Sequence, residues 1–262
     1  RDLHLSIRRQ RQMCIRDSFL ALLYKYTFGQ TKSDGYMACL DIWCTFVDFV
    51  CGTLASTRSV DDCAAVLARY RDAFTALVNE VLSKLQFRCN ATALEDMDDE
   101  TIDDDEETEW QHYLRASIET VLRVSDVLPD EVLRIVEASW KETSVIYLQL
   151  EKYVHQNSKQ LTVRSDRMGT LAGHPEEVEC VRLHHLLRDF ASLLQIVGRL
   201  SVLFTGGSIH DPGFDDHLRQ GLEIVRHLIE LASFGSRAKL YEAQLPAVLI
   251  SDFVQTLSLI HI

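Results

Sequence analysis

Residues 36–55 read YMACLDIWCTFVDFVCGTLA, and this stretch carries two apolar stripes at helical spacing. One stripe consists of Leu40, Trp43, Val47, Val50 and Leu54, and the second consists of Ile42, Phe46 and Phe49. Apolar residues three and four positions apart fall on one face of an α-helix. A helix that is apolar on two faces is buried between neighbours, so we expect this helix to be stacked among others.

The same spacing continues along the chain and predicts further helices at 59–87, 108–128, 129–154, 178–204 and 211–234. The last of these helices is expected to bury four apolar side chains, those of Leu218, Leu222, Val225 and Ile229. No segment shows a convincing strand pattern. Most of the expected helices have about 20 residues or more, against a mean of about 11–12 in globular proteins.

Long helices in succession predict an all-α fold. Antiparallel helix pairs whose equivalent members recur every ~40–50 residues are typical of a HEAT-type α-solenoid, and a compact helical bundle is the alternative. The two-faced helix at 36–55 favours the solenoid. A polar loop is expected at 156–177, where Gly169, Gly173 and Pro175 interrupt the apolar pattern.

An acidic segment follows the second long helix. Residues 95–109 read EDMDDETIDDDEETE, in which eleven of fifteen residues are Asp or Glu and none is basic. A run of like charge cannot pack into a core, so it stays in water or meets a basic partner. Two interpretations remain open, a solvated linker and a loop held by helices to receive a basic surface.

Under the second interpretation the acidic loop at 95–109 is the partner-binding site. Its candidate binding residues are Asp96, Asp98, Asp99, Glu100, Asp103, Asp104, Asp105 and Glu106. The formal net charge of the chain is −12, and most of it lies in this run. A nucleic-acid partner is disfavoured, because phosphate binding needs clustered Lys and Arg.

Sites for chemistry are scarce. Neighbouring residues on a helix point apart, so His184 and His185 are expected to be core or surface residues rather than a metal site. The cysteines outside the first 18 residues form no Cys-x-x-Cys pair and are expected to be reduced thiols of a cytosolic or nuclear protein. No nucleophile, base and oxyanion donor assemble, so we expect no enzyme, no metal and no cofactor. No stretch reaches the ~18 consecutive apolar residues that span a bilayer, so we expect no membrane insertion.

Both ends of the chain are expected to be foreign to the protein. Residues 13–18 read MCIRDS and residues 257–262 read LSLIHI. The DNA string ATGTGTATAAGAGACAG encodes the first of these, and its reverse complement encodes the second, as in a sequencing adapter. We therefore treat 1–18 and 257–262 as translated adapter and assign 19–256 to the fold. A localisation signal or a nucleic-acid arm is the alternative for the basic N-terminus.

Several short motifs carry a family resemblance. They are CLDIW at 39–43, QFR at 86–88, DDETIDDD at 98–105, TEWQ at 108–111, YLR at 113–115, LRD at 187–189 and VGRL at 197–200. In order and spacing they resemble the nuclear export receptors of the importin-β superfamily, over essentially all of 19–256. The match is poor at 156–177 and at 206–212.

This resemblance implies a Ran-GTP-dependent receptor that carries actin–profilin cargo and shuttles between nucleus and cytoplasm. It also implies a large HEAT solenoid, of which this chain would be an internal segment of roughly a quarter, without the N-terminal Ran-binding repeats. In related receptors an acidic loop between the two helices of one repeat reaches a basic patch on Ran. The alternative function is a generic HEAT-like scaffold or tethering protein with a solubilising acidic loop.

Overall fold

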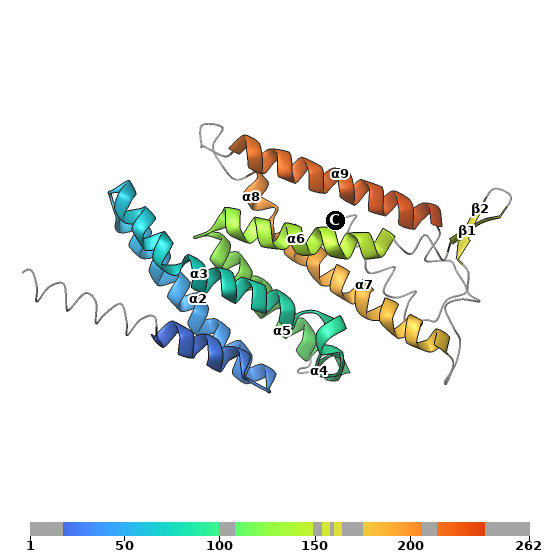
Figure 1. Cartoon of the computed structure of the whole chain (residues 1–262), viewed down its shortest axis with the longest axis horizontal. Coiled ribbons are helices and arrows are strands. Elements are labelled where there is room, and N and C mark those ends of the chain that lie inside the picture. Colours follow the sequence, from blue (N-terminus) through green and yellow to red (C-terminus); the bar gives the residue numbers. More distant parts are fainter. Residues whose placement is uncertain are drawn as a thin grey trace, which may run out of the picture. The chain divides into compact units, whose positions relative to one another are not determined.

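The computed structural model describes residues 18–99, 108–148, 154–157, 160–163, 175–205 and 214–238. In chain order they form a helix at 18–28, α2 (Ser33–Ser56), α3 (Val60–Lys84), α4 (Phe87–Asp99), α5 (Glu109–Ser125), α6 (Pro129–Leu148), β1 (Val154–Asn157), β2 (Gln160–Val163), α7 (Pro175–Leu200), α8 (Val202–Thr205) and α9 (Phe214–Ala238) (Figure 1). The predicted all-α class is confirmed, since one short hairpin is the only sheet within these ranges.

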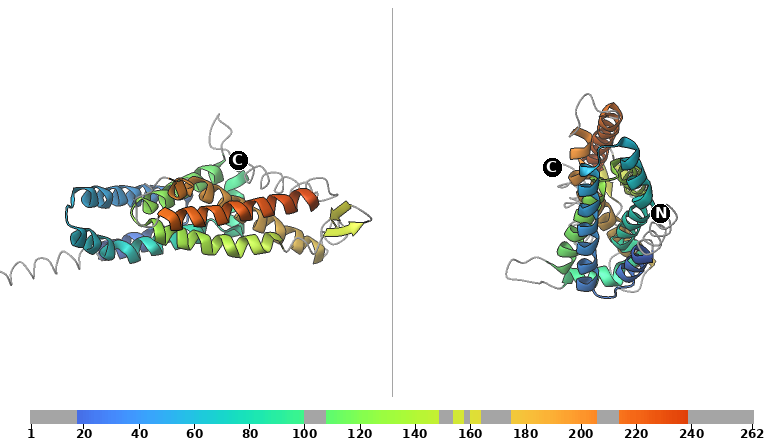
Figure 2. Two further views of the ribbon diagram at one scale, coloured as in Figure 1. Left: turned by 90° about the horizontal axis from the view of Figure 1, so that it is seen from above. Right: turned by 90° about the vertical axis from the view of Figure 1, so that its left-hand side faces the viewer.

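The chain divides into two compact units. Unit one contains the residues up to Lys84 together with Asp96–Leu133, and unit two contains Leu85–Glu95 together with the residues from Arg134 onward. Within unit one, α2 and α3 form an antiparallel pair joined by a turn at 57–59 (Figures 1 and 2). Each unit buries its own apolar core.

The core of unit one is built on α2 and α5. Tyr36 of α2 stacks on Tyr113 of α5, with ring centroids 4.8 Å apart. Trp43 is fully buried, and its Nε1–H donates to Thr27 Oγ1 at 3.0 Å. A buried indole needs such an acceptor, because an unpaired N–H in the core is costly. The buried side of α2 continues through Leu40, Val47 and Val50, as the first apolar stripe predicts.

The second stripe of α2 is not buried as expected. Ile42 is 48% exposed and Phe49 is 62% exposed, while Phe46 is half-buried against the rings of Tyr70 and Phe74. The prediction of burial on two faces is therefore wrong for Ile42 and Phe49. Helical spacing identifies an apolar face, but it does not say which element covers that face.

Among the described helices, α2 alone is long and apolar enough to cross a membrane by length and composition. This is weak grounds for a membrane span, because core helices pass the same test. One face of α2 belongs to the core of unit one. The charged residue Asp48 lies near the centre of α2, and its Oδ1 is 3.4 Å from Arg123 Nη1 of α5. The absence of membrane insertion stays a prediction.

The core of unit two centres on Trp140 of α6. Its ring lies 5.3 Å from that of Phe190 in α7, and its Nε1–H donates to His227 Nδ1 in α9 at 3.1 Å. Because the indole only donates, Nδ1 of His227 must accept, which requires the tautomer with its proton on Nε2. A second contact holds α9, since Gly221 lies directly against the Phe204 side chain of α8.

The outer side of α9 differs from the prediction. The four apolar residues expected inside, Leu218, Leu222, Val225 and Ile229, are 36–61% exposed. The described contacts of α9 include those of Gly221 and His227, and Leu231 is fully buried. The stripe is amphipathic in sequence, yet no described element covers it.

The region after α6 also departs from expectation. The helix ends at Leu148 rather than near 154, and an antiparallel hairpin pairs Val154 with Val163 and Asn157 with Gln160. Because α7 begins at Pro175, the polar loop expected at 156–177 has a strand at its start and a helix at its end. Strands of four residues are too short for a periodic pattern to reveal them.

Candidate functional site

The structure describes the two attachments of the acidic segment and not its centre. Asp96 is exposed in α4, and Asp98 and Asp99 are the last residues of that helix. The other predicted binding residues, Glu100, Asp103, Asp104, Asp105 and Glu106, lie outside the described residues. The expected loop boundaries were wrong at the N-terminal side, because residues 95–99 are helical.

Helix α4, which leads into the segment, was missed as a separate element. The sequence pattern predicted one helix to residue 87, but α3 ends at Lys84 and α4 starts at Phe87. The Gln86 carbonyl accepts from the N–H groups of Cys89 and Asn90, which starts the helix. Gln is not among the preferred N-cap residues, and the first turn of α4 contains no acidic residue.

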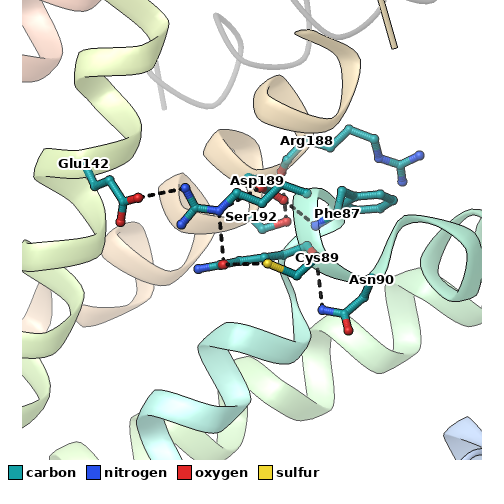
Figure 3. A network of polar contacts seen from close by, with 9 residues as sticks. Phe87, Cys89, Asn90, Glu142, Arg188, Asp189 and Ser192 are labelled. Atoms are coloured by element: carbon teal, nitrogen blue, oxygen red, sulfur yellow. Dashed lines mark hydrogen bonds and ion pairs between the residues drawn. The ribbon is translucent and has the colours of Figure 1, made fainter. Parts of the chain in front are cut away.

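A residue distant in sequence supplies the missing cap. The Phe87 N–H donates to Asp189 Oδ1 of α7 at 2.5 Å (Figure 3). Asp189 is only 4% exposed, and its Oδ2 lies 3.9 Å from Arg88 Nε. The carboxylate thus meets free N–H groups at the positive end of α4, where a negative charge is stabilised.

Burial changes the acidity of this carboxyl group. Removal from water raises the pKa of Asp189 to about 7, because the charged form loses hydration. The N–H groups of Phe87 and Arg88, followed by the charges of Arg88 and Arg188, act in the opposite direction. Desolvation is the larger influence, so the carboxyl group titrates near neutral pH.

The Phe87 ring contacts two side chains of α7. The Arg188 guanidinium lies 4.2 Å from the ring centroid, and the His185 ring is stacked against it at 6.3 Å. A cation over an aromatic face contributes about 0.5–2 kcal/mol, depending on how far it is desolvated. Phe87 itself is fully buried, so the first residue of α4 is fixed by packing as well as by the cap.

Beyond its first turn, α4 bends and is held a second time. Asn90 has non-helical angles, φ −129° and ψ 24°, and its Nδ2 donates to the Gln86 carbonyl at 3.1 Å. After this kink, Glu95 Oε1 lies 2.7 Å from His185 Nε2. His185 was expected to be a plain core or surface residue, but it binds the first carboxylate of the acidic segment.

An exposed ion pair adds a contact to α6. Arg88 Nη1 lies 2.9 Å from Glu142 Oε1. Exposed pairs contribute about 0–1 kcal/mol, because water and salt screen them. This contact supports the position of α4 but is not its main restraint.

The other end of the segment is fixed by local residues. Thr108 Oγ1 accepts from the Gln111 N–H at 3.2 Å, and the Thr108 N–H donates to Gln111 Oε1 at 3.1 Å. This reciprocal capping box satisfies two free donors at the start of α5. Glu109, the last acidic residue of the run, accepts a hydrogen bond from Ser33 Oγ of α2. The predicted helix start at 108–110 is therefore confirmed.

The described residues offer little for catalysis. Within them, no group of three or more His, Cys, Asp or Glu residues could hold a metal ion. Cys39, Cys44, Cys51, Cys63 and Cys89 are free thiols, and Cys89, near the Asp189 cap, is exposed. The arrangement presents charge on a helical scaffold, which fits binding.

Comparison with known proteins identifies the relatives of this chain. No family model and no solved structure matches it. Exportin-6 of Danio rerio and exportin-6-A of Xenopus laevis are each 41% identical over 238 residues, and human exportin-6 is 40% identical over the same length. Each alignment covers 90% of this chain and 20% of the relative.

The chain spans about a fifth of the length of these relatives, somewhat less than the quarter expected. The predicted fold class, an all-α solenoid segment of helix pairs, agrees with this similarity and is confirmed. Over nine-tenths of its length the chain is similar to a segment of exportin-6, and the resemblance predicted from its sequence is confirmed.

Proposed function

We propose that the chain is a segment of a nuclear export receptor of the exportin-6 type. The identity of about 40% to several exportin-6 proteins over 90% of the chain is the observation that carries this proposal. The proposed partners are Ran-GTP and a protein cargo, with actin–profilin as the cargo that the resemblance suggests. Such a receptor shuttles between nucleus and cytoplasm, needs no cofactor and catalyses no reaction.

Within this receptor, the acidic segment at 95–109 is the proposed contact for a basic surface, that of Ran-GTP. Its charge density supports the proposal, and so does the fixation of its first and last carboxylates, those of Glu95 and Glu109. Anchored ends reduce the ordering entropy lost on contact. Exposed charges more than about 8–10 Å apart are screened at physiological salt, so the attraction acts mainly on the association rate.

Charge removal in the full-length receptor tests this proposal. Asp98, Asp99, Asp103, Asp104 and Asp105 are replaced together by Asn. We expect unchanged helicity by circular dichroism and slower association with Ran-GTP, with the larger loss at low salt. The matched control neutralises five exposed acidic residues elsewhere, namely Asp41, Asp72, Asp126, Glu223 and Glu230, with Asn or Gln.

A scaffold or tethering protein with a solubilising acidic run is the alternative. Retention on a Ran-GTP column, compared with a Ran-GDP column, separates the two functions. If the five-Asn variant and the wild type associate with Ran-GTP equally fast at every salt concentration, the acidic segment is a solvated linker and not a binding site.

A further inference from the structure

We propose that His185 and Asp189 of α7 are positioning residues for the acidic segment. They hold α4 on both sides of its kink at Asn90 and so fix the direction of α4, the helix from which the acidic segment continues. We call His185, Arg188 and Asp189 the α7 clamp. The inference rests on the proposed function, because it assigns to the clamp a role in the association of the acidic segment with a basic protein surface.

Helix α4 needs outside support to remain folded. It has 13 residues and is interrupted at Asn90, whereas isolated helices shorter than about 12–15 residues are marginal in water. The residue at its N-cap position is Gln86, which is not one of the preferred capping types. The bond from the Phe87 N–H to Asp189 therefore replaces a cap that the local sequence does not provide.

The clamp reaches both parts of α4 from one face of α7. His185 and Asp189 are separated by one helical turn, so their side chains lie on the same side. Asp189 binds the first turn at Phe87, while His185 binds beyond the kink at Glu95. The Phe87 ring also contacts the His185 ring and the Arg188 guanidinium, so packing against α7 adds a further restraint on the first turn.

A fixed exit direction affects binding through entropy and rate. A charged segment that leaves a rigid helix end samples fewer orientations before contact, so less conformational entropy is lost on binding. The residues immediately after Glu95 include the predicted binding residues Asp96, Asp98 and Asp99, which inherit the orientation of α4. If the clamp opens, the backbone of α4 at these residues loses its fixed direction.

Hydrogen exchange in the full-length protein tests the clamp without any partner. Asp189→Ala removes the acceptor of the Phe87 N–H, and we expect amides at 87–99 to exchange about 5–30 times faster, the range for a lost cap. Asp189→Asn keeps a carbonyl acceptor and is expected to retain most of the protection. His185→Ala is expected to affect 91–99 and spare the first turn.

Ser192→Ala provides the matched control. Ser192 is buried one turn further along α7, and the hydrogen bond described for its side chain runs to the Arg188 carbonyl of the same helix. This variant is expected to leave exchange at 87–99 unchanged. Equal amide exchange rates at 87–99 in wild type, Asp189→Ala and His185→Ala would overturn the proposal that the α7 clamp holds α4.

Association rates with Ran-GTP at low salt then test positioning. We expect Asp189→Ala to associate about two to ten times more slowly, Asp189→Asn and Ser192→Ala at the wild-type rate, and the five-Asn variant most slowly. Suppose that Asp189→Ala exchanges faster at 87–99 but associates with Ran-GTP at the wild-type rate, while the five-Asn variant associates slowly. This result would overturn the positioning role of the α7 clamp and would leave the proposed function intact. A five-Asn variant as fast as wild type overturns both.

Discussion

His185 Nε2 lies 2.7 Å from Glu95 Oε1, so the first carboxylate of the acidic segment is bound to α7. The last carboxylate of the segment, Glu109, is likewise bound, as it accepts from Ser33. The charges left for a partner are those between these two residues. Neither Glu95 nor Glu109 was among the predicted binding residues, and the structure gives both a role in the scaffold.

Gly221→Ala should destabilise unit two. A Cβ at this position would lie 2.8 Å from Phe204 Cβ, so α8 or α9 must shift. Overpacking of this kind costs about 1–3 kcal/mol. Gly198→Ala in α7 is the control, since its Cβ would meet nothing within 4 Å. Ala is favoured over Gly in a helix by about 0.5–1 kcal/mol, so this control should raise the urea midpoint while Gly221→Ala lowers it.

Thr27→Val should destabilise unit one by about 1–3 kcal/mol, because it leaves the buried Nε1–H of Trp43 without an acceptor. The cost should shrink in a Trp43→Phe background, where no donor remains, and a double-mutant cycle in urea measures this coupling. Thr45→Val is the control, as Thr45 is exposed and donates only to the Asp41 carbonyl of its own helix. Equal costs of Thr27→Val in both backgrounds would exclude the bond as the cause.

Asp189 should make stability depend on pH. Its pKa is raised from 3.8 to about 7 in the folded chain, so the folded state binds more protons than the unfolded state between these values. The contribution of this group is fully present below pH 3.8 and is lost as the pH rises through about 7. The melting temperature of Asp189→Asn relative to wild type should therefore rise from pH 5 to pH 8. A constant difference across this range would contradict the raised pKa.

The exposed stripe of α9 should cause self-association of the chain in isolation. Leu222 and Ile229 are each 61% exposed, and apolar surface of this kind favours contact between molecules. Leu222→Lys should weaken association about tenfold or more, because burying a Leu side chain contributes about 1.5–3 kcal/mol. Gln220→Lys adds the same charge at an exposed polar position and should have little effect. Sedimentation velocity over a range of concentrations measures both variants.

Local sequence signals predicted α5 well. Thr108 and Gln111 form the capping box within one turn, and the inward residues Trp110, Leu114 and Ile118 are buried as their spacing indicates. Both signals depend only on residues close in sequence, so a pattern reveals them. Phe74 and Leu77, which are three positions apart in the helix predicted at 59–87, are likewise buried in α3.

The start of α4 could not be predicted in this way. Its cap is Asp189, which lies 102 residues further along the chain. The exposed stripes of α2 and α9 show the same limit, because spacing defines an apolar face without naming its partner. The hairpin of β1 and β2 was missed since its strands have four residues each. What sequence patterns missed were long-range relations and very short elements.

The two ends of the acidic segment also differ in how they could be transferred to another protein. A graft of the acidic segment with its flanking residues includes the capping box, because Thr108 and Gln111 lie next to the segment in the sequence. Such a graft does not include the groups that hold α4, since Asp189 and His185 belong to α7. A graft of residues 87–113 into a foreign scaffold would thus keep a defined C-terminal boundary and lose its N-terminal one. To transplant the oriented segment, one must transplant part of α7 with it.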